Sequence, residues 1–431
     1  MPLKSFHIIT YGCQMNQYDS NVISKKLEAL GLKKTQDPQD AELVLVNTCS
    51  VRENAEIRAE GRLNSLAGGV RTIKKVGVIG CMAQRKGRKL MDKIKGLDFA
   101  IGPDQIESIF DIVNEEIPGG AFLGNTDYTG KGNYSGADGR ISAFVAINRG
   151  CDNFCKYCIV PYVRGRLRSR DNTDIIEEIK MLAQDGIREI TLLGQNVNAY
   201  HYKHIGFDKL LEQVADIEDI RRIRFTTNHP KDLTKEIIDT MANLDKVAPM
   251  IHLPVQSGSS KILDAMGRGY DRQKYLEIID YVKSKIDNIA IASDILVGYP
   301  GESDEDFQET VSLIDKVDFA SLFCFKYSVR PGTAAARLDD DVPEHIKLKR
   351  IQNVIKLGQE KARKYSQKQI GKVLNVMIEG RSEKDKHLIR GYAGNSRVVE
   401  FESEDMPLPG KFVKVKIDSA SSWKLYGKEL K

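Results

Sequence analysis

Three cysteines lie within one short stretch, RGCDNFCKYC, with the spacing Cys-x3-Cys-x2-Cys. They are Cys151, Cys155 and Cys158. A structural zinc site has four Cys or His ligands, and no histidine occurs between His7 and His201 to supply a fourth one nearby. Thiolates are also the ligands of iron–sulfur clusters. Three cysteines would leave one iron of a four-iron cluster open to a small molecule, so we favour a cluster and keep a zinc or structural site as the alternative.

Three further cysteines each follow a short apolar segment. SFHIITYGC ends in Cys13, AELVLVNTC ends in Cys49 and KKVGVIGC ends in Cys81, and a helical pattern follows each segment. Alternating apolar strands and amphipathic helices predict a parallel sheet. The carboxyl ends of parallel strands share one edge, where α/β sheets bind ligands. We therefore expect these cysteines to meet there; the alternative is that each is a small buried residue.

A second α/β block follows the glycine-rich segment PGGAFLGNTDYTGKGNYSGADG, which predicts a linker. The candidate strands of this block are Ser142–Asn148, Glu189–Gly194, Arg222–Thr227, Met250–Val255, Ile289–Leu296 and Ser321–Tyr327. Helical patterns separate them, and six βα units predict an open or partial barrel. Its functional residues should lie at the carboxyl ends of the strands.

The last part of the chain changes to an alternating pattern in KVLNVMIEG, HLIRGYAGNSRVVEFE and GKFVKVKID, which predicts a small all-β barrel. We therefore expect an α/β protein with four parts. These are a doubly wound α/β domain at 1–117, a linker at 118–140, a (βα)6 partial barrel at 141–365 and a small all-β barrel at 366–431.

Composition sets broad limits on the function. The formal net charge is +5, which is too small by itself to indicate a nucleic-acid partner, although the last 66 residues carry most of the excess. No apolar run approaches the roughly 18 residues of a membrane span, and the N-terminus lacks the features of a signal peptide. We expect a soluble cytoplasmic protein, and we expect no disulfides among its seven cysteines because that compartment is reducing.

The Cys-x3-Cys-x2-Cys motif, with the aromatic Tyr157 before its last cysteine, resembles the radical S-adenosylmethionine superfamily. The motifs YGCQMNQYDS, NTCSVRENAE, GCMAQR, LLGQNVNAY, HLPVQSGS, DILVGYPGE and YSVRPGTAAA resemble the methylthiotransferases over essentially the whole chain. The β-rich tail resembles the RNA-binding TRAM domain. The resemblance implies two 4Fe-4S clusters, one on each trio of cysteines, and S-adenosylmethionine as a cofactor bound at the second cluster.

The resemblance also implies the reaction. Reductive cleavage of S-adenosylmethionine at the second cluster yields a radical that takes a hydrogen from carbon 2 of an adenine, and a methylthio group is delivered there. GCQMN, NTCSVRE and TTNHPKDLT are most similar to the MiaB type, which acts on isopentenyladenosine beside the tRNA anticodon. The alternatives are threonylcarbamoyladenosine in tRNA or an aspartate of a ribosomal protein. A non-catalytic iron–sulfur RNA-binding protein is the alternative from a different class.

Other motif residues are expected to bind the cofactor by resemblance. Tyr157 would lie near its adenine, and the residues after the second barrel strand near its methionine part. Gln256 and Ser257 could reach the ribose or the substrate, and Arg330 could pair with a carboxylate. The full set is Tyr157, Gly194, Gln195, Asn196, Gln256, Ser257 and Arg330. Ordinary turns after strands are the alternative for the glycine-containing motifs.

Four arginines alternate with other residues in RGRLRSR. An extended backbone would place Arg164, Arg166, Arg168 and Arg170 on one face. There they could contact RNA phosphates, although salt bridges to acidic helices are an alternative. The expected partners are the anticodon stem-loop of tRNA and an electron donor such as flavodoxin or ferredoxin. We expect a monomer that does not associate with membranes.

Overall fold

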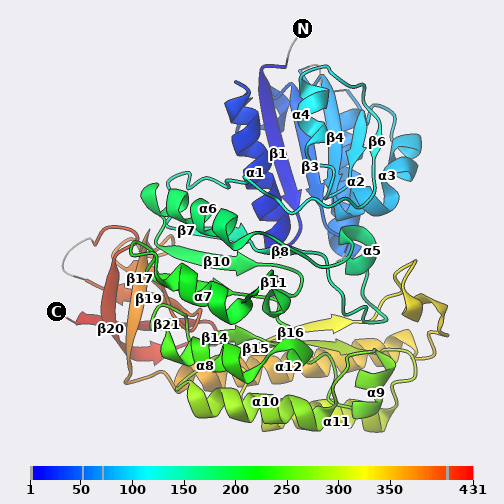
Figure 1. The fold of residues 1–431 in the computed structure, drawn as a ribbon. Helices are drawn as coiled ribbons and strands as arrows, with labels where there is room; N and C mark the ends of the chain where they lie inside the picture. Colours follow the sequence, from blue (N-terminus) through cyan, green and yellow to red (C-terminus); the bar gives the residue numbers. More distant parts are fainter. Residues whose placement is uncertain (1–2, 51–52, 70–71, 404–406, 431) are drawn as a thin grey trace.

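The computed structural model describes residues 3–50, 53–69, 72–403 and 407–430. It has three parts that follow one another along the chain and in Figure 1, from the blue α/β domain through the green and yellow partial barrel to the red β-barrel. In the part of the chain described, no helix has both the length and the apolar character of a membrane span.

The first part is a parallel sheet in the order β2-β1-β3-β4-β5-β6. Its strands are β1 (Ser5–Tyr11), β2 (Lys33–Lys34), β3 (Leu43–Thr48), β4 (Lys75–Gly80), β5 (Phe99–Ile101) and β6 (Ala121–Phe122). Its helices are α1 (Gln14–Ala29), α2 (Glu53–Ala67), α3 (Cys81–Lys93) and α4 (Ser108–Val113). Apolar residues of α1 and α4 share one core cluster with the sheet, and those of α2 and α3 share another. Helices therefore cover both faces, as a doubly wound domain requires.

The predicted linker contributes to this first sheet. β6 lies inside the glycine-rich segment and pairs in parallel with β5, so the first domain extends past the predicted boundary at residue 117. Asn133 and Ser135, further along the segment, are buried. A strand of two residues is too short to show alternation, which explains why the composition alone predicted a linker.

The second part contains the six strands predicted from the sequence. They are β7 (Ser142–Ala146), β10 (Glu189–Leu193), β13 (Arg222–Phe225), β14 (Met250–His252), β15 (Ala290–Val297) and β16 (Ser321–Lys326). They form two parallel sheets, β13-β10-β7 and β14-β15-β16, joined by a parallel bridge between Ile223 and Val247. No pairing of β7 with β16 occurs among the residues described, so the partial barrel is open, as expected.

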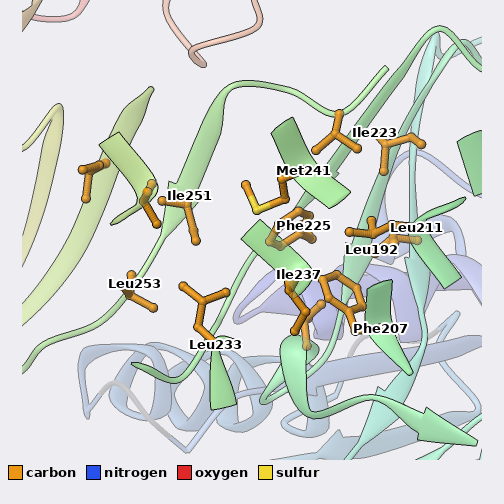
Figure 2. Close-up of a cluster of buried hydrophobic side chains, with 14 of the residues drawn as sticks. Leu192, Phe207, Leu211, Ile223, Phe225, Leu233, Ile237, Met241, Ile251 and Leu253 are labelled. Atoms are coloured by element: carbon orange, nitrogen blue, oxygen red, sulfur yellow. The ribbon is translucent and has the colours of Figure 1, made fainter. Parts of the chain in front are cut away.

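Helices cover the outer face of these strands. They are α6 (Asn172–Gln184), α7 (Phe207–Ala215), α8 (Lys235–Asn243), α9 (Ser260–Ala265), α10 (Arg272–Lys285), α11 (Asp304–Lys316) and α12 (Glu344–Gln367). Figure 2 shows Ile223 and Phe225 of β13 in one apolar cluster with Phe207 of α7 and Met241 of α8. Successive side chains of a strand point to opposite faces, so the residues between these core positions face the barrel interior.

Short elements connect the larger ones around the second cysteine trio. They are β8 (Asn148–Arg149), α5 (Val160–Arg164), β9 (Arg168–Ser169), β11 (His201–Tyr202) and β12 (Ile205–Gly206). The 3-10 helices are η1 (Pro38–Asp40), η2 (Val197–Ala199), η3 (Pro230–Asp232) and η4 (Ala334–Arg337).

The third part is a closed barrel in the order β17-β18-β19-β21-β20. Its strands are β17 (Val373–Arg381), β18 (Ile389–Ala393), β19 (Val398–Glu402), β20 (Phe412–Ala420) and β21 (Lys424–Leu430). Their inward side chains form one apolar cluster, which confirms the all-β barrel expected from the alternation.

Two arginines of β13 hold the closed barrel against the partial barrel. Arg222 donates hydrogen bonds to the carbonyl oxygens of Asn375 and Tyr392, at 3.1 and 2.8 Å. Arg224 donates to two neighbouring carbonyls of the same barrel. Both guanidinium groups also contact Glu189 Oε2, at 3.3 and 3.0 Å. The hydrogen bonds that Arg222 and Arg224 donate to the closed barrel therefore go largely to backbone carbonyl oxygens.

Candidate functional site

The three N-terminal cysteines lie at one edge of the first sheet. The last residues of β1, β3 and β4 are paired directly across the sheet, and Cys13, Cys49 and Cys81 follow these ends. A hydrogen bond with Cys49, aided by the positive charge of Arg164, lowers the pKa of Cys13 to about 6. A lowered pKa favours the thiolate, which is the form that binds metals.

The second trio lies on the loop after β8. The Cys158 N–H donates to the carbonyl of Cys155 at 2.9 Å, which keeps two of the thiols in one turn. Gly150, which precedes the trio, has φ of +76°, and a side chain there would meet the Arg166 carbonyl at 2.0 Å. Burial raises the pKa of Cys158 to about 12. These thiols would therefore release protons when a metal binds.

The two trios are joined by α5. Ile159, the residue after Cys158, and Val163 pack with Cys81 in one buried apolar cluster. Arg164, the last residue of α5, donates from Nε to Cys81 Sγ at 3.2 Å. The carboxyl edge of the first sheet therefore lies directly against the loop that carries the second trio.

A buried ionic cluster fixes this contact. Asp19 of α1 accepts from Arg149 at 2.7 Å and from Arg164 at 3.2 Å, and each of the three side chains is at most 3% exposed. Buried charges cost several kcal/mol to desolvate and must be closely paired. The cluster therefore holds α1 in one position relative to the second domain.

The arginine run does not form the exposed face that alternation predicted. Arg164 ends a helix and is buried, and Arg170 is buried against Asp174 and Glu178 at 2.6 Å from each. The prediction is wrong for these two because acidic residues remote from the run, or on the following helix, hold their guanidinium groups inside the protein.

The other two arginines of the run differ in exposure. Arg168 pairs with Asp104 of the first domain at 2.7 Å and is mostly buried. Arg166 is 72% exposed and pairs with Asp152 at 2.7 Å. Of the four, Arg166 alone has the exposure that a phosphate contact requires.

Two residues beside Cys155 were missed by sequence reasoning. Buried Arg268 donates to Cys155 Sγ at 3.3 Å and to the Tyr157 hydroxyl at 3.4 Å. His229 Nε2 lies 3.8 Å from the same sulfur, and burial lowers the pKa of His229 to about 2, so its ring is neutral. Its Nδ1 accepts from the Lys231 N–H, which leaves Nε2 to donate to the thiolate. No local spacing links these residues to the cysteine motif.

The predicted cofactor residues after β10 have internal partners. A side chain at Gly194 would meet Asn148 Oδ1 at 1.9 Å, which explains the glycine by packing. Gln195 accepts from the Gly150 N–H at 2.6 Å, so it supports the loop of the second trio. Asn196 donates to Asp232 at 2.6 Å.

The remaining predicted residues differ in their surroundings. The backbone of Gln256 bridges to β15, and the Ser257 hydroxyl is fully buried against Thr310 Oγ1 at 3.2 Å. Arg330 is half-buried on the segment after β16. The structure therefore brings Tyr157 and Gln195 against the second trio and turns the Ser257 hydroxyl toward a helix.

Features of this structure fit iron–sulfur clusters with a bound small molecule. Each trio offers three thiols, and buried arginines donate to one sulfur of each. Three buried amide oxygens at the ends of neighbouring strands, those of Asn148, Asn196 and Asn228, have no hydrogen-bond partner in the described residues. Such atoms call for a ligand or water. Within the same residues no set of His, Cys, Asp or Glu forms a single-ion site, but the thiolates of a cubane bind different iron atoms.

Comparisons with known proteins agree with this arrangement. Residues 145–314 match the model of the Radical SAM superfamily, residues 5–102 that of the Uncharacterized protein family UPF0004, and residues 367–430 that of the TRAM domain. The chain is 41% identical over 447 residues to the tRNA-2-methylthio-N(6)-dimethylallyladenosine synthase of Clostridium botulinum (strain Langeland), covering 99% of this chain and 97% of that protein. It is 43% identical over 449 residues to the synthase of that name from Caldicellulosiruptor saccharolyticus, covering 98% and 92%.

A solved structure shares the fold. It is the radical S-adenosylmethionine methyltransferase TsrM from Kitasatospora setae, with cobalamin and a 4Fe-4S cluster bound. The TM-score is 0.59 at 14% sequence identity, and the match covers 78% of this chain and 77% of that one.

The buried ionic cluster yields a stability prediction. Asp19→Asn should lower the free energy of unfolding by about 3–5 kcal/mol, because it leaves two buried guanidinium groups without their carboxylate. Asp152→Asn removes the carboxylate from the exposed ion pair with Arg166. It should lower the free energy of unfolding by less than about 1 kcal/mol. Urea unfolding of both variants measures the difference. Equal losses would show that the buried cluster does not stabilise the contact between the domains.

Proposed function

This chain belongs to the family of tRNA-2-methylthio-N(6)-dimethylallyladenosine synthases, and on that premise we propose that it adds a methylthio group to carbon 2 of isopentenyladenosine in tRNA. The observation that carries the proposal is the contact between the two cysteine trios, in which Arg164 on the segment of one trio donates to Cys81 of the other. A reaction that uses two metal clusters on one substrate requires that the two sets of cysteine ligands lie close together.

The chemistry explains why two clusters are needed. Carbon 2 of an adenine carries an unactivated C–H bond, which an ordinary general base does not remove. Two 4Fe-4S clusters and S-adenosylmethionine, when bound, supply one-electron chemistry and sulfur, while the protein orients the reactants and excludes water. We assign one cluster to Cys13, Cys49 and Cys81 and the other to Cys151, Cys155 and Cys158.

The chain's own residues tune these ligands. Hydrogen bonds to cluster sulfurs help to set reduction potentials, and we assign this role to Arg164 at Cys81 and to Arg268 and His229 at Cys155. The three amide oxygens without partners are suited to accept from the amino group of the cofactor. Tyr157 is held beside the second trio by Arg268.

The partners follow from the three-part architecture. We assign tRNA binding to the TRAM barrel, with Arg166 as an additional phosphate contact near the site. The target base lies in an anticodon loop, where unpaired bases can be turned out toward a protein. The finer proposals are a monomeric cytoplasmic enzyme and reduction by a flavodoxin or ferredoxin.

The substrate is tested in cells. A deletion strain should lose 2-methylthio-isopentenyladenosine from its tRNA and accumulate the isopentenyladenosine precursor, as read by mass spectrometry of the nucleosides. The wild-type gene and Cys324→Ala, which changes the cysteine outside both trios, should restore the product. Cys151→Ala should not. An unchanged nucleoside profile in the deletion strain would overturn the assignment of the substrate.

The cluster assignment is tested by iron content after anaerobic reconstitution. Two 4Fe-4S clusters correspond to about eight irons per chain. Cys13→Ala should lose roughly half of the iron, because the second trio remains intact, whereas Cys324→Ala should keep all of it. Full iron retention in Cys13→Ala would refute a cluster at the N-terminal trio.

A further inference from the structure

Three side chains on the inner face of β14, β15 and β16 contact one another. Ile251 and Ile295 belong to the core beneath the outer helices, so His252 and Asp294 point into the partial barrel. His252 Nε2 donates to Asp294 Oδ1 at 2.8 Å. Asp294 lies opposite Phe323 in the register of β15 and β16. The Phe323 ring meets the His252 ring edge to face, with centroids 5.8 Å apart.

This inner-face cluster, His252, Asp294 and Phe323, stays accessible. Phe323 is 51% exposed, which is unusual for an aromatic ring in the middle of a strand on the inner face of a barrel. The other half of the barrel is different, because Met15 and Tyr18 of α1 pack with Ala146 and Leu193 over the inner face of β7 and β10.

One end of the inner-face cluster is linked to the N-terminal trio. Gln14, the residue after Cys13, accepts a hydrogen bond from Thr226 at 3.3 Å. Asn228, two residues after Thr226, donates a hydrogen bond to the carbonyl oxygen of His252 at 2.9 Å. A short chain of contacts therefore runs from Cys13 to His252.

The other end is linked to the second trio. Phe325 lies one pleat beyond Phe323 on the same face of β16. Phe325 and Tyr157 both pack against one apolar cluster that includes Leu296, and Tyr157 precedes Cys158. Contacts therefore link the inner-face cluster to both trios, as the binding place of a substrate that reacts with both requires.

We propose that the inner-face cluster binds the target adenine, which stacks on Phe323 and donates its N6–H to the Asp294 carboxylate. The inference rests on the proposed function. Single-stranded bases are recognised by stacking on aromatic rings and by hydrogen bonds to their edges. An ionised carboxylate only accepts hydrogen bonds, and isopentenyladenosine keeps one hydrogen on N6. The hydrogen bond from His252 holds Asp294 in place.

An adenine could also come from the cofactor. Tyr157, which the resemblance places near the cofactor adenine, packs against the buried cluster that includes Leu296, whereas Phe323 is 51% exposed. A base of the RNA can reach this accessible ring from solvent. We therefore assign the adenine of the RNA to Phe323 and Asp294, and the experiment distinguishes it from the adenine of the cofactor.

The test measures RNA affinity of the reconstituted full-length protein by fluorescence anisotropy. The probes are two labelled anticodon stem-loops, one with isopentenyladenosine and one with N6,N6-dimethyladenosine at the target position. Phe323→Ala should weaken binding of the first RNA about tenfold, and Phe323→Tyr should restore it, because base stacking on an aromatic ring is lost and then regained. Wild-type protein should prefer the first RNA, and Asp294→Ala should abolish that preference.

Two further measurements identify the source of the adenine. Iron content and 5′-deoxyadenosine formation without RNA should match the wild type in both alanine variants. Unchanged RNA affinity in Phe323→Ala would overturn the proposal, and so would loss of cofactor cleavage with unchanged RNA binding, which would assign the cofactor adenine to this place. If wild-type protein makes no methylthio product from the first RNA, the proposed function fails instead.

Discussion

The arrangement of the two cysteine trios depends on one buried carboxylate. Asp19 lies six residues after Cys13, and its partner Arg164 lies six residues after Cys158. An ion pair between them therefore sets the position of one trio relative to the other. Because buried ion pairs are often no more stable than apolar replacements, the value of this one lies in the single orientation that it permits. Arg164 then reaches Cys81, so the group that joins the domains also contacts a candidate ligand.

Local periodicity was enough to predict the parts of the fold that follow it. The six barrel strands occur within a few residues of the predicted ranges, since continuous apolar runs mark buried parallel strands. The position of Cys13, Cys49 and Cys81 followed from the same logic, because the carboxyl ends of parallel strands share an edge. The structure adds the register that brings those three strand ends level.

The rest could not be predicted because it depends on contacts between residues far apart in the chain. The arginine run looked extended, yet Asp19 and Asp104 of another domain determine where Arg164 and Arg168 lie. Arg268 lies more than a hundred residues after the sulfur to which it donates. Phe323 looks like any core aromatic in the sequence, and only the open barrel leaves its ring accessible.

The docking of the closed barrel through Arg222 and Arg224 has a consequence for substrate choice. The two side chains donate to backbone carbonyl oxygens of that barrel, so these hydrogen bonds do not depend on which side chains its strands carry. If the enzyme binds tRNA at this barrel, the fixed docking also fixes the distance between the bound RNA and the reacting centre. Such an enzyme selects its target nucleotide by the distance of that nucleotide from the part of the RNA bound at the barrel, and also by the identity of the base.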